Sequence, residues 1–267
     1  HPRGEEGVFY NPAGLVNSNK TSVLFGYNDL YNLSFIEHNF LSIVIPNPNT
    51  KSAFALSYQN MQTSYGNNST YAFNGDLSRE TSLSVSQGIK ISDDRNSSLS
   101  IGYNLNYLLF YQAPSSGYDG GGVNGMPAGE SSTISFDVGL YSVLRNKISF
   151  GAYIKNLSSS RMGKGSSLTF IPRRLNIGVG YMPYSGLSTH FSLDRLLDEE
   201  RSSFRFGFEY LVKKSFEIRS GVQISENNNR FGIGFSVYLK NIVVSYGVLT
   251  HSILDNINTL EMQVSFD

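Results

Sequence analysis

The 267-residue sequence contains no cysteine, which excludes disulfides, thiol nucleophiles and cysteine-ligated metal sites. It has no tryptophan, and no run approaches the roughly 20 apolar residues of a membrane-spanning helix. Charged residues make up only 16 % of the chain, below the roughly 25 % usual in soluble domains. The 21 basic and 21 acidic residues cancel, and the basic ones are scattered, which argues against a nucleic-acid-binding surface.

Aromatic and small polar residues take the place of charges. The chain has 17 tyrosines, 18 phenylalanines and 26 glycines, and serine and asparagine supply most of its polarity. Its mean hydropathy is nevertheless −0.20, so the chain as a whole is not hydrophobic. Two fold classes fit this composition: a soluble β-sandwich or fibre protein, and a transmembrane β-barrel, whose apolar signal lies in alternation.

Alternation runs through nearly the whole chain. In RFGIGFSVYL, residues 230–239, Phe231, Ile233 and Phe235 share one face of a strand, and Gly232 and Gly234 share the other. The same period predicts about fourteen strands, at 21–30, 33–45, 52–61, 83–89, 99–107, 134–140, 148–154, 175–181, 187–196, 203–211, 215–224, 230–239, 242–250 and 259–266. Most of these are near the length that crosses a bilayer when tilted.

The polar face of these strands favours the barrel. The exposed face of a soluble sandwich is normally rich in lysine, glutamate and threonine, whereas here it carries glycine, serine, asparagine and a few charges of both signs. Such residues suit a crowded, wet interior, and bulky Phe, Ile, Leu and Val suit lipid. We therefore predict that the lumen is lined by Asp137, Lys155, Arg174, Arg205, Glu209, Glu217 and Arg219.

Connector lengths give a second, independent argument. The connections after even-numbered strands are short, at 46–51, 93–97, 145–147, 183–186, 213–214 and 240–241. Those after odd-numbered strands include much longer ones, at 113–130, 158–170 and 251–258. Transmembrane barrels have short periplasmic turns and longer external loops. The two patterns together predict a fourteen-stranded antiparallel transmembrane barrel with both termini on the periplasmic side.

The first 20 residues do not alternate and form a separate unit. In FYNPAGL the residues Phe9, Tyr10, Asn11, Pro12, Ala13, Gly14 and Leu15 combine helix-start signals with apolar contacts. Asn11 is a good N-cap, and Pro12 suits the first helical position. We predict a short capped turn, ended by Asn17 in a left-handed conformation, that lodges in the lumen as a hatch. Residues 1–20 would be this hatch, and residues 21–267 the barrel.

Reactive chemistry is weakly represented. His190 lies on an inward face beside Ser188 and Ser192, but without a nucleophile motif it is better interpreted as a hydrogen-bonded lumen histidine than as a hydrolase base. The charge clusters at 93–95 and 198–201 are interpreted as solvated turns rather than metal sites. Arg205, Glu209, Glu217 and Arg219 form either a salt-bridge ladder or a selectivity lining, and their balanced signs favour the ladder. We therefore expect that the protein is not an enzyme and that it binds no cofactor and no metal.

Several segments resemble a known superfamily. VFYNPAGL, residues 8–15, is similar to the motif that precedes the first strand in FadL-like outer-membrane proteins. ISFDVGLYSVL (134–144), GAYIKNLSSS (151–160) and IPRRLNIGVGYMP (171–183) resemble the central stretch of its PorV/PorQ branch. The resemblance implies a fourteen-stranded barrel with an N-terminal hatch. FadL members take up hydrophobic compounds, and PorV members serve type IX protein secretion.

Function is expected to follow one of these branches. The central motifs predict a PorV-like component or partner of a secretion or outer-membrane assembly complex. The alternative is a FadL-like channel for hydrophobic small molecules, and a third possibility is a purely structural barrel. The expected location is the bacterial outer membrane after removal of a signal peptide, with lipid, protein partners or a hydrophobic ligand as contacts. We predict that the longest external loop docks a partner through Ser115, Tyr118, Gly121, Asn124 and Gly129.

Overall fold

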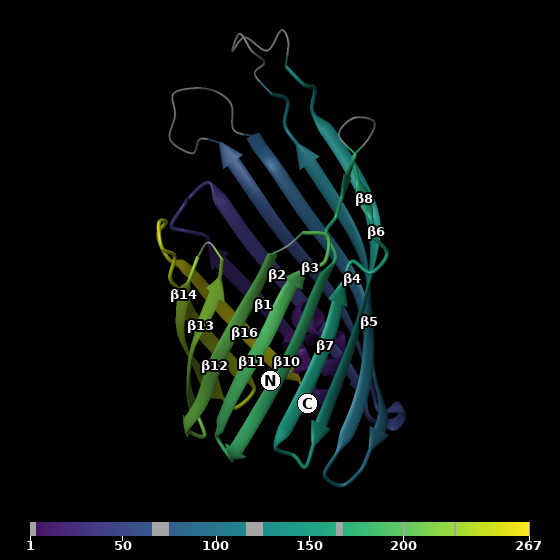
Figure 1. Cartoon of the computed structure of the whole chain (residues 1–267), viewed down its shortest axis with the longest axis vertical. Coiled ribbons are helices and arrows are strands. Elements are labelled where there is room, and N and C mark those ends of the chain that lie inside the picture. Colours follow the sequence, from purple (N-terminus) through teal and green to yellow (C-terminus); the bar gives the residue numbers. More distant parts are fainter. Residues whose placement is uncertain are drawn as a thin grey trace.

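The computed structural model shows a closed antiparallel β-barrel with its N-terminal segment inside (Figure 1). It describes the whole chain except residues 1–3, 66–74, 116–124, 164–167, 200, 227 and 267. The barrel strands are β1 Thr21–Asp29, β2 Ile36–Asn47, β3 Ser52–Tyr65, β4 Gly75–Asp93, β5 Ser98–Gln112, β6 Gly129–Leu144, β7 Ile148–Lys155, β10 Arg174–Tyr184, β11 Leu187–Leu196, β12 Arg201–Lys213, β13 Phe216–Ser225, β14 Arg230–Leu239, β15 Ile242–Leu249 and β16 Ile257–Phe266.

Fourteen strands follow one another around the wall, and β1 closes the barrel by pairing with β16 from Thr21↔Phe266 to Asp29↔Asn258. The fourteen alternating segments of the sequence are confirmed as these strands. The pair β8 Arg161–Met162 and β9 Thr169–Phe170 was not predicted. It forms a separate two-stranded sheet in the connection between β7 and β10. Two residues per strand are too few for an alternation signal.

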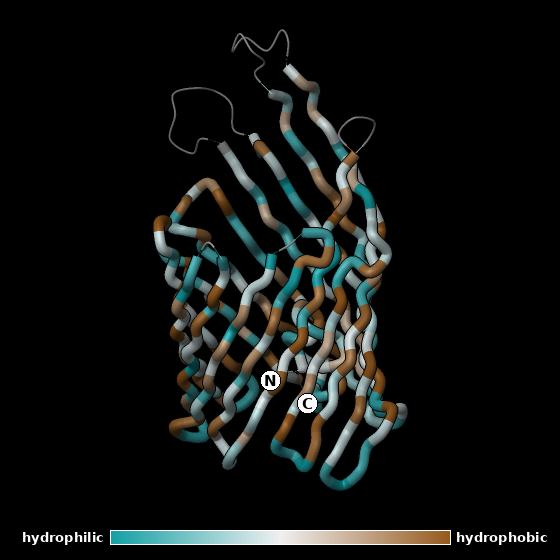
Figure 2. Tube along the Cα trace, viewed as in Figure 1, coloured by the Kyte–Doolittle hydropathy of each residue, from teal (hydrophilic) through white to brown (hydrophobic). Residues whose placement is uncertain are grey.

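The two faces of the wall differ as the alternation predicts. Large apolar side chains point outward and are exposed: Phe206 to 52 % and Ile233 to 54 %. Hydrophobic and hydrophilic positions alternate along the strands in Figure 2. An outward apolar face and a polar interior are the features of a barrel that sits in a bilayer. No helix in the described part of the chain is long and apolar enough to cross a membrane.

The wall is uneven in height. β4 has 19 residues and β6 has 16, whereas β7 has only 8. β3 to β6 therefore rise well above the rest of the barrel at the end that carries the long loops, at the top of Figure 1. The short connections lie at the opposite end, where Lys51, Asn146 and Lys240 adopt positive φ in tight turns.

The N-terminal segment folds as three short helices: η1 Gly4–Glu6, α1 Gly7–Tyr10 and η2 Pro12–Asn17. Residues 4–17 are called the plug below. Asn11 caps η2, with its side-chain oxygen accepting from the amide of Ala13 at 3.1 Å, and Pro12 occupies the first turn, as predicted. The left-handed ending at Asn17 was wrong. Asn17 still belongs to η2, and the chain leaves through Ser18 in an extended conformation, φ −73° and ψ 127°, directly toward β1.

Candidate functional site: a lumen divided by the plug

The plug rests on a row of wall glycines. Gly88, Gly102 and Gly139 are direct partners on β4, β5 and β6. A Cβ at Gly102 would overlap backbone atoms of Pro12 and Ala13, and one at Gly88 would lie 2.7 Å from the Pro12 oxygen. The row is thus a flat strip on which the backbone of the plug lies in direct contact. The close approach depends on the glycines of the wall.

Asn11 fastens the plug to the neighbouring strands. Its side-chain nitrogen donates to the carbonyl of Leu140 on β6 at 3.0 Å and to that of Ala152 on β7 at 3.4 Å. Its oxygen meanwhile caps η2. One side chain therefore starts the helical turn and also binds it to the wall.

Apolar contacts also hold the plug against the wall. Val8 and Leu15 of the plug are buried together with Val44, Ala53 and Ala55 of β2 and β3. The rings of Phe9 and Phe40 meet edge to face at 5.2 Å. These contacts all fall on the β2–β6 side of the lumen, so the plug occupies one half of the barrel.

Above the plug, a buried carboxylate joins three strands. Asp137 on β6 is fully buried, and one of its oxygens accepts from Asn106 and from the Tyr153 hydroxyl, both at 2.8 Å. Its other oxygen accepts from the backbone amide of Asn156 at 2.8 Å. Asn104 donates both to Asp137 and to the carbonyl of Val8 in the plug, at 3.3 and 3.2 Å. A buried carboxylate needs such donors, and here they also tie the plug to the wall.

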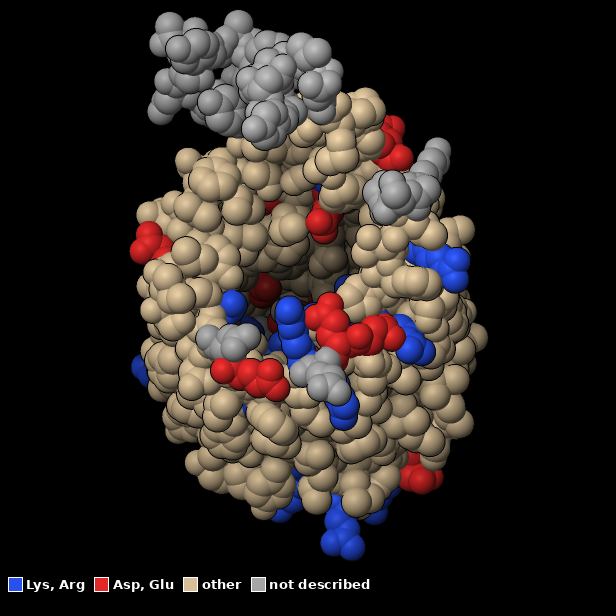
Figure 3. All heavy atoms as spheres, turned by 45° about the horizontal axis from the view of Figure 1, so that its top comes forward, with Lys and Arg blue, Asp and Glu red and all other residues tan. Residues whose placement is uncertain are grey.

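The opposite half of the lumen is lined by charges. Arg174 and Arg205 both contact Asp194, at 2.9 and 3.3 Å, from β10 and β12. Farther toward the short-turn end, Arg219 pairs with Glu217 at 3.0 Å and donates to Ser236 at 2.6 Å. Figure 3 looks into this interior from the long-loop end and shows it hollowed, with charged groups around its mouth.

The structure places the seven predicted lining residues, Asp137, Lys155, Arg174, Arg205, Glu209, Glu217 and Arg219, at inward positions. It divides them between two environments. Asp137 belongs to the buried network, whereas the other six line cavities. Glu209 and Arg219 are cross-strand partners, whereas Arg219 forms an ion pair with Glu217 on its own strand. The roles of these residues stay predictions.

His190 is a hydrogen-bonded lumen histidine. Its Nε2 lies 3.3 Å from the Ser188 hydroxyl and 3.9 Å from Glu209. Both partners face the same ring nitrogen, whereas a catalytic triad needs the acid on the other nitrogen to orient the ring toward the serine. The arrangement is a polar cluster and does not match a hydrolase site.

The wall is interrupted above β7. β6 pairs with β7 only from Val138 to Leu144, and beyond that point residues 157–163 lie along its edge. Side chains replace the regular ladder there: the Ser158 hydroxyl accepts from the Phe136 amide at 3.1 Å, and the Ser160 hydroxyl donates to the Ile134 carbonyl at 2.5 Å. Asn156 turns the chain away from the wall with φ 58°.

Only part of the predicted docking loop lies among the described residues. Tyr118, Gly121 and Asn124 lie outside the described residues. Ser115 accepts a bond from the amide of Met126 at 2.8 Å, and Gly129 begins β6. The docking role stays a prediction.

Sequence reasoning missed the residues that seat the plug. The glycines at 88, 102 and 139 are inward positions in alternating segments, and their shared row depends on strand register, which alternation does not define. Asn104, Asn106 and Asn156 were likewise missed as partners of Asp137. A usable signal was present, since a lone inward carboxylate in a low-charge chain requires donors on adjacent strands.

No protein-family model matches the sequence, and no match is found among curated proteins. Solved structures do match. The toluene transporter TbuX of Ralstonia pickettii superposes with a TM-score of 0.68 at 13 % identity, covering 98 % of this chain and 94 % of that one. A FadL homologue of Pseudomonas aeruginosa gives 0.64 at 12 %, covering 100 % and 95 %. The CymD monoaromatic hydrocarbon channel gives 0.65 at 12 %, covering 100 % and 94 %. The chain therefore has the fold of FadL-like barrels.

Proposed function

We propose that the protein is an outer-membrane channel for small hydrophobic molecules. The fold is shared along its whole length with proteins named as toluene transporters and a monoaromatic hydrocarbon channel. That likeness supports the barrel and its location. The class of solute is inferred from the wall of this chain.

The observation that carries the proposal is a set of bulky apolar side chains on the inward face above the plug. Asn104 and Asn106 point inward, so Leu108 and Phe110 on the same strand share that face. Met61 on β3 also takes an inward position in the paired rows beside them. Bulky apolar groups facing a polar lumen have no packing partner in water, but they would favour a hydrophobic solute entering from the long-loop end.

The secretion-complex hypothesis receives less support. The motifs that carried that resemblance contain Asp137 and Asn156, and both belong to the buried network. In this structure these two residues hold the strands and the plug together. The architecture of the barrel therefore accounts for the motifs without a role in secretion. Recovery of secretion subunits with the protein from native membranes would revive that hypothesis.

Uptake of a radiolabelled monoaromatic hydrocarbon by cells whose outer membrane is the limiting barrier tests the proposal. Expression of the full chain should raise uptake, and Phe110→Ser combined with Leu108→Ser should lower it. Leu109→Ser is the matched control, because Leu109 lies on the same strand and faces outward. Equal uptake with and without the protein would overturn the proposed function.

A further inference from the structure

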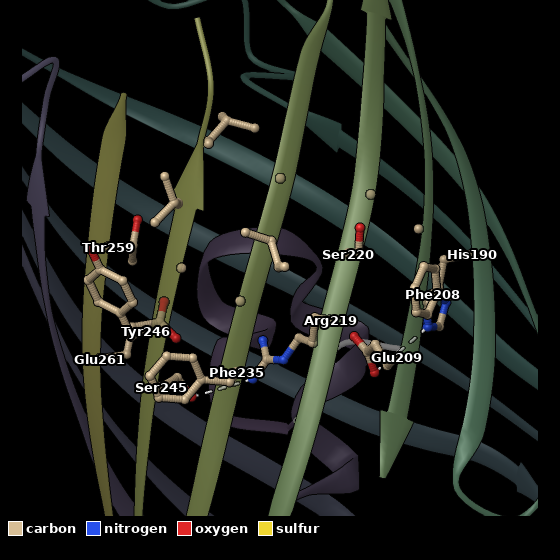
Figure 4. Close-up of a pocket in the computed structure, with 18 residues that line it drawn as sticks. His190, Phe208, Glu209, Arg219, Ser220, Phe235, Ser245, Tyr246, Thr259 and Glu261 are labelled. Carbon is tan, nitrogen blue, oxygen red and sulfur yellow. Dashed lines mark hydrogen bonds and ion pairs between the residues drawn. The ribbon is translucent and has the colours of Figure 1, made fainter. Parts of the chain in front are cut away.

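Three sizeable cavities lie, within the described part of the chain, in the half of the lumen that the plug leaves free. The outer cavity, about 590 Å³, lies between the plug residues Phe9 and Tyr10 and the wall residues Lys155, Arg174 and Arg205. The middle cavity, about 310 Å³, lies against β12 to β16 and is shown in Figure 4. The inner cavity, about 410 Å³, includes Glu5 of the plug and Met182 and Gly186 beside a short turn.

These cavities adjoin one another along the wall. The outer and middle cavities share His190, Gly207, Gly221 and Gly232 as lining residues. The middle and inner cavities share Glu209. In Figure 4 the side chains of Glu209 and Arg219 project into the space between the strands and the plug. The series therefore runs from the long-loop end past the plug to the short-turn end.

Glycine keeps this half open. Gly207, Gly221 and Gly232 are direct partners on β12, β13 and β14. A Cβ at Gly207 would come no closer than 3.4 Å to any neighbour, and one at Gly232 no closer than 3.5 Å. Unlike the glycines under the plug, these two face space that nothing in the described chain fills. A barrel of this strand number is wide enough to hold water wherever it is not plugged.

The lining suits hydrophilic solutes and, at the outer cavity, anions. Lys155 and Arg174 are direct cross-strand partners, and like charges at such positions repel. Asp194 is the one carboxylate among the described residues that line the outer cavity, and it already contacts Arg174 and Arg205. A cavity with more cations than carboxylates raises the local concentration of anions.

We propose that the protein contains a second, aqueous pathway beside the plug, which conducts small hydrophilic solutes and prefers anions at its outer mouth. The plug forms one side of this pathway. The pathway is separate from the apolar inward face above the plug, so it stands or falls independently of hydrocarbon uptake.

Planar-bilayer recording of the full chain in KCl tests the proposal. The intact protein should conduct without removal of the plug, and Gly232→Trp should abolish most of this conductance by filling the cavity. Ile233→Trp is the matched control, because it adds a similar bulk on the outward face of the same strand. Gly207→Leu, on another strand, gives a second lumen variant should Gly232→Trp fail to fold, and heat-modifiable gel mobility monitors folding of all three.

Charge preference is read from the reversal potential under a KCl gradient. The reversal potential of the full chain should shift toward the chloride equilibrium potential, and Lys155→Glu should reduce that shift. A folded full chain that does not conduct, or lumen variants that conduct as well as Ile233→Trp, would overturn the pathway. A cation preference that Lys155→Glu leaves unchanged would overturn the assignment of the outer cavity as its mouth.

Discussion

The two halves of the lumen have the same alternating pattern, but one half is filled by the plug and the other is open. On the β2–β6 side, the plug covers Gly88, Gly102 and Gly139, and the network around Asp137 is buried and hydrogen-bonded. On the β10–β16 side, Gly207 and Gly232 face open space, and inward charges line cavities. A glycine row can thus admit a backbone or leave room for water. What decides between them is whether another part of the chain covers the row.

The same contrast holds for the carboxylates. Asp137 is fully buried and accepts bonds from two strands besides its own and from the amide of Asn156. Glu209 borders two cavities, lies 3.9 Å from His190 and accepts from the Ser188 hydroxyl at 3.5 Å. Burial without water makes every bond of Asp137 matter for stability, whereas Glu209 can exchange protein contacts for water.

The largest expected effect comes from Asp137→Ala. Asn106, Tyr153 and the Asn156 amide would each lose a buried acceptor, at about 1–3 kcal/mol apiece. We expect a loss of about 3 kcal/mol or more in unfolding free energy, together with loosening of the plug through Asn104. Urea unfolding in lipid vesicles measures it. Glu209→Ala, on the open side, should change stability by less than about 1 kcal/mol, and equal losses would contradict the comparison.

Phe206→Arg tests which face of the open half meets lipid. Phe206 points outward, and an arginine near the middle of the membrane costs roughly 2–4 kcal/mol in such barrels. Gly207→Ser, the adjacent inward position, should be mild. Folding yield into vesicles and urea midpoints of the two variants provide the measurement. Equal tolerance would mean that the faces are reversed.

Gly102→Val compares the two glycine rows. Its side chain would overlap the backbone of Pro12 and Ala13, and overpacking of this kind costs about 1–3 kcal/mol. We expect the plug to lift from the wall and become sensitive to protease, and the conductance to rise. Gly207→Val, in the row that faces open space, should leave the plug protected. Protection in both variants would place the plug elsewhere.

Asn11→Ala should have a smaller effect on the attachment of the plug to the wall. The cap contributes about 1 kcal/mol, and the bond to the Leu140 carbonyl adds about as much, giving about 2 kcal/mol in total. Protease cleavage within residues 4–17 should accelerate while the barrel still resists heat. Asn17→Ala is the control, because Asn17 plays no part in the cap. A barrel that melts together with the plug would show that the two are one cooperative unit.

The smallest expected effect lies at the rim of the open half. Arg173 contacts Asp198 through two nitrogens, at 2.7 and 3.2 Å, and this bonding lowers the pKa of the Asp198 carboxyl. Because that pKa is depressed in the folded state, the contact is complete above the ordinary aspartate pKa and is lost as pH falls through the folded value. A spin label at Leu168 should become more mobile on acidification, and Asp198→Asn should remove that pH dependence. Unchanged label mobility would show that the contact does not restrain the segment.

The pattern of the sequence by itself determined the strands, their faces and the end of the barrel that carries the long connections. Alternation at period two is a local property, so Phe231, Ile233 and Phe235 could be assigned to one face without knowledge of any neighbour. The cap at Asn11 and Pro12 was equally local, because it involves residues two positions apart. Closure of β1 on β16 followed from the strand number and the position of the termini.

Tertiary structure alone decided which part of the lumen is filled. Gly88, Gly102 and Gly139 form one row only after the register of three strands is set, and Gly207, Gly221 and Gly232 form another by the same rule. In sequence the two rows look alike. The plug lies on the first because Asn11 donates to the Leu140 carbonyl and the Val8 carbonyl accepts from Asn104, contacts between residues 129 and 96 positions apart. Such long-range bonds leave no periodic trace in the sequence, because each depends on strands brought together by folding.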